Sequence, residues 1–176
     1  ESNAFGTQAY YDVALKIFMD QCREMFGNEQ LGFTICELAR YEGNPYAYSI
    51  VNEKSNQVAE DDSRVVVARN LDLGEWKDIH PKDKHEIGRR AAYETLRVFF
   101  KKDKPEPIKI IDYTFNSDGS VTIELSKNAS LVNGTNGFEV CIDGAYTYAC
   151  NAHVDGNELT LSADGIATSA DTSSEW

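Results

Sequence analysis

The chain has 176 residues, of which 41% are apolar and 11% aromatic, enough for one packed domain or slightly more. Its formal net charge is −12, and because a surface of this sign repels phosphate backbones, we expect no nucleic acid partner. No apolar run reaches the roughly 18 residues of a membrane span, so we expect no membrane partner. A neutral ligand, or a compact site shielded from the overall field, fits this composition better.

Thr7 can cap a helix over residues 8–26, and Gly27 suits the position just after its end. The apolar stretch 31–39 predicts a strand, and residues 48–59 predict a weaker helix. Steps of three and four in the first helix predict one apolar face, which consists of Tyr11, Ala14, Phe18, Cys22 and Met25.

Residues 64–71, RVVVARNL, form a continuous β-branched run that predicts a strand buried on both faces, as in a parallel sheet. After a polar loop, Asp83 and Glu86 form a capping box that predicts the start of a helix. Lys101 and Lys102 are expected in the last turn of this helix, where they suit its dipole. The inner face of the helix is predicted to consist of Ile87, Ala91, Thr95, Leu96 and Phe99.

The first hundred residues therefore alternate helix, strand, helix, strand and helix. This order predicts an α/β fold with a parallel sheet, in which ligands bind at the carboxyl ends of the strands. Residues 101–109 form a charged, proline-containing joint, and short alternating runs separated by Asp-Gly turns follow it. We expect two domains: residues 1–101 as a partial parallel sheet with flanking helices, and residues 102–176 as a small antiparallel β module.

Four cysteines are present without any CxxC pair, so a zinc knuckle is not expected. Cys22 and Cys36 fall on a predicted helix and a predicted strand, where we expect them to be small buried apolar side chains. Cys141 and Cys150 flank IDGAYTYA, a predicted hairpin, and could face each other across neighbouring strands, although the sequence leaves their bonding open. Such a bond and two glycosylation sequons, NAS and NGT, would indicate an extracellular, periplasmic or lysosomal location.

Of the three histidines, His153 lies in a predicted strand and is expected to fill space, and His85 lies in the first turn of a predicted helix and is expected to be solvated. His80 differs, because it follows a buried strand, precedes Pro81 and has Asp78 two residues before it. A carboxylate that holds an imidazole in one tautomer makes it a competent general base. The alternative is an ordinary loop histidine in an acidic turn.

A metal site is a rival interpretation, because Asp78, His80, Asp83 and His85 are clustered in the sequence. They lack the i, i+4 helical spacing of a zinc-binding histidine pair, and no thiol joins them. We therefore expect no metal ion at this cluster.

The segment DLGEWKDIHPKDKHEIGRRAA resembles the DLG…DIHPKNK…VGERLA block of sialate O-acetylesterases and related carbohydrate acetylesterases in the serine-dependent SGNH hydrolase group. The opening ESNA resembles the end of that family's WYQGESNA segment. The stretch GFEVCIDGAYTYACNAHVDGNELTLSADGI resembles the family's C-terminal β module. The resemblance covers nearly the whole chain in the right order, and the histidine block is its specific part.

The resemblance implies a mechanism without a metal or organic cofactor. A serine in an N-terminal GQSN segment would attack the acetyl carbonyl of an O-acetylated sugar, and His80 would take the serine proton and return it to the sugar oxygen. The oxyanion donors would include the Gln and Gly that precede ES in the family motif, and each such donor typically contributes about 10²–10³ in rate.

The chain departs from the family pattern in two ways. It contains no GQSN, and its first residue falls inside the QGES motif, so Glu1 matches a supporting residue of the site and Ser2 matches a serine that is not the nucleophile. Wider SGNH enzymes have Asp three residues before His, where this chain has Lys77. Asp78 matches this family's DIH and would orient His80, unless a backbone carbonyl does so.

We therefore expect this chain to be the C-terminal part of a serine-type carbohydrate O-acetylesterase, with an O-acetylated carbohydrate as substrate. Its expected partner is the missing N-terminal half of the same protein, and the polypeptide is expected to be inactive alone. Two alternatives stay open: a non-catalytic carbohydrate-binding relative, and a fragment of an acetylxylan-type esterase.

Overall fold

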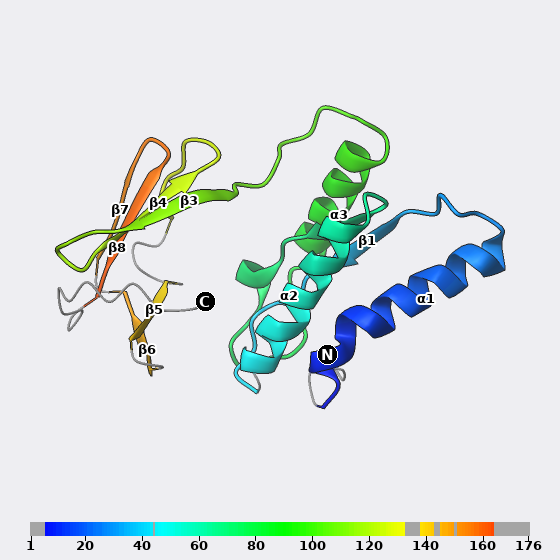
Figure 1. Ribbon diagram of the computed structural model, residues 1–176, viewed down its shortest axis with the longest axis horizontal. Coiled ribbons are helices and arrows are strands. Elements are labelled where there is room, and N and C mark those ends of the chain that lie inside the picture. The colour runs from blue at the N-terminus through cyan, green and yellow to red at the C-terminus, as the bar shows by residue number, and fades with distance from the viewer. Residues whose placement is uncertain (1–5, 44, 133–137, 143–144, 150, 164–176) are drawn as a thin grey trace. The chain divides into compact units, whose positions relative to one another are not determined.

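The computed structural model describes residues 6–43, 45–132, 138–142, 145–149 and 151–163. The chain divides into two compact units, Glu1–Glu106 and Pro107–Trp176, which Figure 1 draws as a helix-rich part and a strand-rich part. The sequence predicted a boundary between residues 101 and 102. Each unit is described by itself below.

The first unit is α/β, as predicted. Strands β1 and β2 pair in parallel, in a register that runs from Phe33 opposite Val65 to Cys36 opposite Ala68. Strand β1 is shorter than the predicted stretch 31–39. The elements of this unit are a 3-10 turn Gln8–Tyr10, α1 Tyr11–Phe26, β1 Phe33–Cys36, α2 Pro45–Asp61, β2 Val65–Ala68, a 3-10 turn Leu71–Leu73 and α3 Lys84–Val98.

Strand β2 is the centre of the first unit. All four of its residues are buried, because α2 and α3 both contact it while α3 also contacts β1 (Figure 1). Val65 joins Met19 of α1 and Val58 of α2 in one apolar cluster. The prediction of a strand covered on both faces is therefore confirmed.

The prediction for the C-terminal end of α1 is confirmed, and the prediction for its N-terminal end is wrong. Gly27 ends the helix in the left-handed conformation with φ of 59°, as predicted, and its N–H donates to the carbonyl of Glu24 at 3.1 Å. The Thr7 side chain makes no capping hydrogen bond, so that prediction is wrong. The reason is that the chain enters through a 3-10 turn, in which the Thr7 carbonyl accepts from the Tyr10 N–H.

The predicted apolar face of α1 does not match the face that packs. Phe18 and Met25, expected in the core, are 56% and 78% exposed, and Ala14 is also exposed. Met19 is instead buried, with Leu15 packed beside it. Since α1 carries apolar residues around much of its circumference, helical spacing alone did not identify the side that contacts α2 and β2.

The start of α3 was predicted correctly. The Asp83 carboxylate accepts from the Glu86 N–H at 2.9 Å, which is the expected cap. The Glu86 side chain does not return to Asp83 but binds Arg89 and Arg90 on its own helix. The helix ends at Val98, so the prediction that Lys101 and Lys102 lie in its last turn is wrong.

The second unit is antiparallel, as predicted. Its larger sheet has the strand order β3-β4-β8-β7 and buries Leu125, Leu159 and Leu161 on one face. Strands β5 and β6 form a separate antiparallel pair. The strands are β3 Ile110–Phe115, β4 Val121–Leu125, β5 Glu139–Ile142, β6 Ala145–Tyr148, β7 Asn151–Asp155 and β8 Glu158–Ser162.

The cysteines do not follow the predictions of burial. Cys22 is half-buried and Cys36 is exposed, so neither is the fully buried side chain that was expected. Cys141 has Tyr146 as its pairing partner in the β5–β6 hairpin. Cys150 lies outside the described residues, so a disulfide between Cys141 and Cys150 stays a prediction.

Within the described part of the chain, no helix combines the length and apolar character needed to cross a membrane.

Candidate active site

The segments that leave β1 and β2 meet at the carboxyl edge of the parallel pair. Glu37 follows β1 directly, and its side chain is only 7% exposed. Its carboxylate accepts the backbone N–H of Asn70 at 2.8 Å and of Leu71 at 3.1 Å, both just beyond β2. Because a nearly buried carboxylate needs such partners, these two bonds tie the two strand ends together.

Asn52 of α2 holds the next residue of the first segment. Its side-chain oxygen accepts the Leu38 N–H at 2.8 Å, and its amide nitrogen donates to the Leu38 carbonyl at 2.9 Å. Asn52 is buried, and this pairing satisfies both ends of its amide group. The segment after β1 is therefore anchored to α2 as well as to β2.

Gly74 allows the two segments to approach each other closely. Arg40 donates from its side-chain Nε to the Gly74 carbonyl at 2.9 Å and from its backbone N–H to the Leu71 carbonyl at 3.3 Å. A Cβ atom at Gly74 would lie 2.4 Å from the Arg40 carbonyl oxygen. Only glycine fits there without moving the backbone, which explains this residue at the start of the loop.

We expect Gly74→Ala to destabilise the protein by about 2 kcal/mol, because its Cβ would collide with backbone rather than with a mobile side chain. Gly88→Ala is the matched control. Gly88 lies inside α3, and a methyl group added there would meet nothing within 4 Å, so we expect this change to stabilise the protein by about 0.5–1 kcal/mol. Urea unfolding of both variants gives the two values, and equal effects would contradict the close approach.

Arg90 of α3 also binds the segment that follows β2. Its guanidinium binds both Asp72 carboxylate oxygens, at 2.6 and 2.8 Å, and also donates to the Arg69 carbonyl at 2.8 Å. The hydrogen bonds from Arg90 lower the pKa of the Asp72 carboxyl below its usual value. Glu86 accepts from the Arg90 Nε at 2.9 Å, so the arginine is held in one orientation.

His80 and Asp78, the predicted catalytic pair, lie together in this anchored loop. Asp78 Oδ1 accepts the His80 backbone N–H at 3.0 Å and lies 3.8 Å from Nδ1 of the imidazole. The latter distance is longer than a hydrogen bond. The His80 side chain is 76% exposed, so the imidazole is accessible to a reacting group. Ile79, between them, packs against the buried cluster that contains Tyr48.

The remaining residues singled out in the sequence are Glu1, Asp83, His85 and His153. Glu1, the expected supporting residue, lies outside the described residues. Asp83 is used as the cap of α3, and His85 is exposed in the first turn of that helix, as expected. In the described ranges, no group of three or more His, Cys, Asp or Glu side chains could hold a metal ion. His153 is exposed on β7 and does not fill space in the core as expected.

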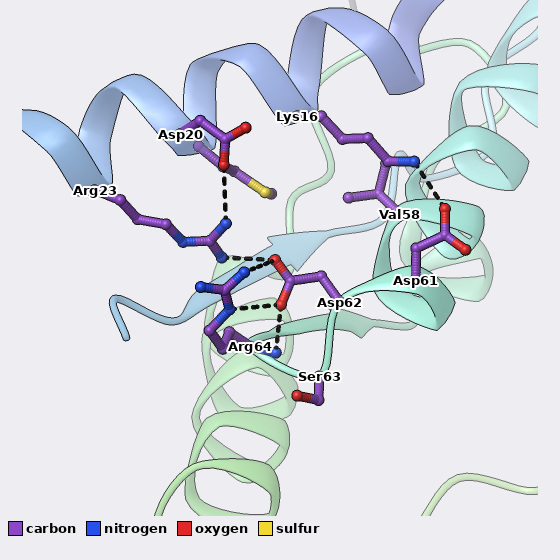
Figure 2. Close-up of a pocket in the computed structure, with 9 residues that line it drawn as sticks. Lys16, Asp20, Arg23, Val58, Asp61, Asp62, Ser63 and Arg64 are labelled. Carbon is purple, nitrogen blue, oxygen red and sulfur yellow. Dashed lines mark hydrogen bonds and ion pairs between the residues drawn. The ribbon is translucent and has the colours of Figure 1, made fainter. Parts of the chain in front are cut away.

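An open pocket of the first unit lies at the opposite edge of the sheet, just before β2. It has a volume of about 480 Å³ and contains the charged residues that Figure 2 shows, with the Asp62 carboxylate between the guanidinium groups of Arg23 and Arg64. Hydrogen bonds from Arg64, and then from Arg23, lower the pKa of the Asp62 carboxyl to about 2.

Both guanidinium groups at this pocket already donate hydrogen bonds to other groups of the same chain. Arg23 donates to Asp20, Asp62 and the Leu31 carbonyl, and Arg64 donates to Asp62 and the Glu29 carbonyl. The pocket therefore holds an ion network that joins α1 to the start of β2, and the exposed imidazole lies at the other end of the strands.

The anchors of the loop were not identified from the sequence. Glu37 fell inside the predicted strand 31–39, and Arg90 is one of several arginines in its part of the chain. Asp72 is recognisable in the sequence as an acidic residue between the buried strand and His80, but its role as an anchor was not predicted. Its partner Arg90 lies 18 positions later, beyond the range of any local pattern.

Comparison with known proteins shows that this chain has a fold similar to part of a solved structure. No family model matches the chain, and no curated protein matches it. A carbohydrate acetylesterase from Xanthomonas citri, known from its crystal structure, has a similar fold, with a TM-score of 0.79 and 20% sequence identity over 95% of this chain. The chain spans 41% of the length of that acetylesterase. At this identity the likeness shows the fold: a mixed α/β unit followed by antiparallel strands, shared with part of a carbohydrate acetylesterase.

Proposed function

We propose that this chain is part of a serine-type carbohydrate O-acetylesterase of the sialate O-acetylesterase kind, with His80 as its general base. The observation that carries the proposal is an exposed imidazole at the carboxyl edge of a parallel sheet, with the Asp78 carboxylate 3.8 Å from Nδ1. The fold likeness to a carbohydrate acetylesterase and the resemblance of the DIHPK block support it.

In the proposed reaction, a serine oxygen attacks the acetyl carbonyl carbon, and the imidazole of His80 takes the serine proton. The bond from the acetyl carbon to the sugar oxygen then breaks, and His80 returns the proton to that oxygen. Water attacks the acetyl-enzyme with His80 again as base, and acetate leaves. Asp78 would hold the imidazole in one tautomer and stabilise its protonated form.

The serine of this proposal comes from polypeptide outside residues 1–176, and Glu1 supports the site beside it. The surface of α1 is consistent with a covering segment of this kind, because Val13, Ile17 and Phe18 are each more than half exposed. Apolar patches of this kind usually mark a contact surface. Secretion to an oxidising compartment is part of the same proposal.

The test uses the protein as its gene encodes it, incubated with O-acetylated sialic acid and with acetylated xylan. We expect acetate release from the sialic acid ester, and no release by residues 1–176 alone. Release from xylan only would favour an acetylxylan-type esterase. Glycan binding without acetate release would favour a non-catalytic relative and contradict the proposal. Hydrolysis by residues 1–176 alone that is lost in His80→Ala would contradict the external serine.

A further inference from the structure

Glu75 makes two hydrogen bonds that close the loop around His80. Its backbone carbonyl accepts the Asp78 N–H at 3.2 Å, and its side-chain Oε2 accepts the Lys82 N–H at 3.1 Å. The carboxylate therefore spans from the entry of the loop to its exit. Asp78 and His80 both lie between these two contact points.

The position of Pro81 makes the Lys82 contact significant. Proline has no backbone N–H, and the N–H of His80 is already donated to Asp78. The first free backbone donor after the imidazole-bearing residue is therefore the Lys82 N–H, and Glu75 accepts it. Asp78 thus holds the backbone of His80 at its own N–H, and Glu75 holds the backbone two residues later, at the Lys82 N–H.

Glu75 is itself well placed to act as an anchor. The residue before it, Gly74, is buried against Arg40, and the carbonyl of Trp76 after it accepts the Glu42 N–H at 2.8 Å. The Glu75 side chain is half-buried. A carboxylate attached to fixed backbone can hold a loop more firmly than one on a mobile surface segment.

We propose that Glu75 is a positioning residue, which orients His80 for proton transfer by holding the Lys82 amide. This inference rests on the proposed esterase function. Glu75 touches neither substrate nor the reacting atoms in this proposal. Its effect is to keep the imidazole of an otherwise exposed loop in one place relative to the serine.

The test compares Glu75→Ala with Glu75→Gln in the protein as its gene encodes it. Without an acceptor for the Lys82 amide, we expect Glu75→Ala to lower kcat about tenfold with little change in KM, since one charge-assisted hydrogen bond is lost. Gln keeps an acceptor oxygen, so we expect Glu75→Gln to recover most of kcat. Glu60→Ala, at an exposed carboxylate near the end of α2, is the control for charge and should match the wild type.

Hydrogen exchange of the Lys82 amide provides a readout that does not depend on activity. It should be about tenfold faster in Glu75→Ala than in the wild type or in Glu75→Gln, if the bond is worth about 1.4 kcal/mol. Wild-type kcat or unchanged Lys82 exchange in Glu75→Ala would overturn the role of Glu75 while leaving the esterase function intact. A gene-encoded protein without any esterase activity would overturn both, and the exchange data would then report only on loop structure.

Discussion

Replacing His80 by asparagine is expected to lower kcat for acetate release by about 10³-fold or more, with KM nearly unchanged. Asn keeps a polar side chain of similar size at this exposed position, so the loop should retain its structure. In the proposed reaction, the substitution removes the group that takes the serine proton and returns it to the sugar oxygen. The measurement is steady-state hydrolysis of an O-acetylated sugar by the protein as its gene encodes it.

His85→Asn is the matched control for this prediction. His85 lies five residues later in the first turn of α3 and is also exposed, but no carboxylate holds it in the described structure. The same chemical change there should leave kcat within about twofold of the wild type, as expected of surface substitutions. Comparable losses in both variants, or full activity in His80→Asn, would show that His80 is an ordinary loop residue.

Replacing Arg23 by alanine is expected to cost about 3 kcal/mol of unfolding free energy. The Arg23 side chain is only 8% exposed, and its partner Asp62 is 18% exposed, so the substitution leaves a poorly solvated carboxylate with one donor fewer. Arg23 also donates to the Leu31 carbonyl and lies over the Phe33 ring, so its loss affects the entry to β1 as well. Urea unfolding monitored by circular dichroism measures the change.

The pair Lys16–Asp61 is the control, because it joins α1 to the residue directly before Asp62. Its side chains are 47% and 64% exposed, so Lys16→Ala should cost less than about 1 kcal/mol. The contribution of the Asp62 carboxylate to the free energy of unfolding should also depend on pH. Its pKa falls from 3.8 to about 2 on folding, so its stabilisation is complete above about pH 4 and is lost as the pH falls towards 2. Equal costs for Arg23→Ala and Lys16→Ala would contradict the buried network.

Local signals in the sequence were sufficient for the elements and for several of their ends. The run of Val65, Val66 and Val67 predicted a strand covered on both faces, and the structure buries all three. Gly27 and Asp83 ended and began helices as predicted, because a cap depends on residues within one turn. The alternation of helices and strands likewise predicted the parallel pair, since it follows from the order of elements alone.

Contacts between segments far apart in the sequence decided which face of α1 packs and which residues hold the His80 loop. Apolar residues on α1 do not reveal which of them meet α2 and β2, so Phe18 was expected inside and Met19 was not. The bonds that hold the His80 loop link Glu37 to Asn70, and Asp72 to Arg90, over spans that no local pattern covers.

The sequence by itself determined the order of the helices and strands, the α/β class and the position of His80 beyond a buried strand. Those features depend on hydrophobic periodicity, caps and turn residues, which act over a few neighbours. Only the tertiary structure decided that the loop is held by Glu37 and Arg90, and that Arg40 approaches Gly74 closely. Distances of this kind depend on how strands and helices pack, because packing brings together residues that are far apart in the chain.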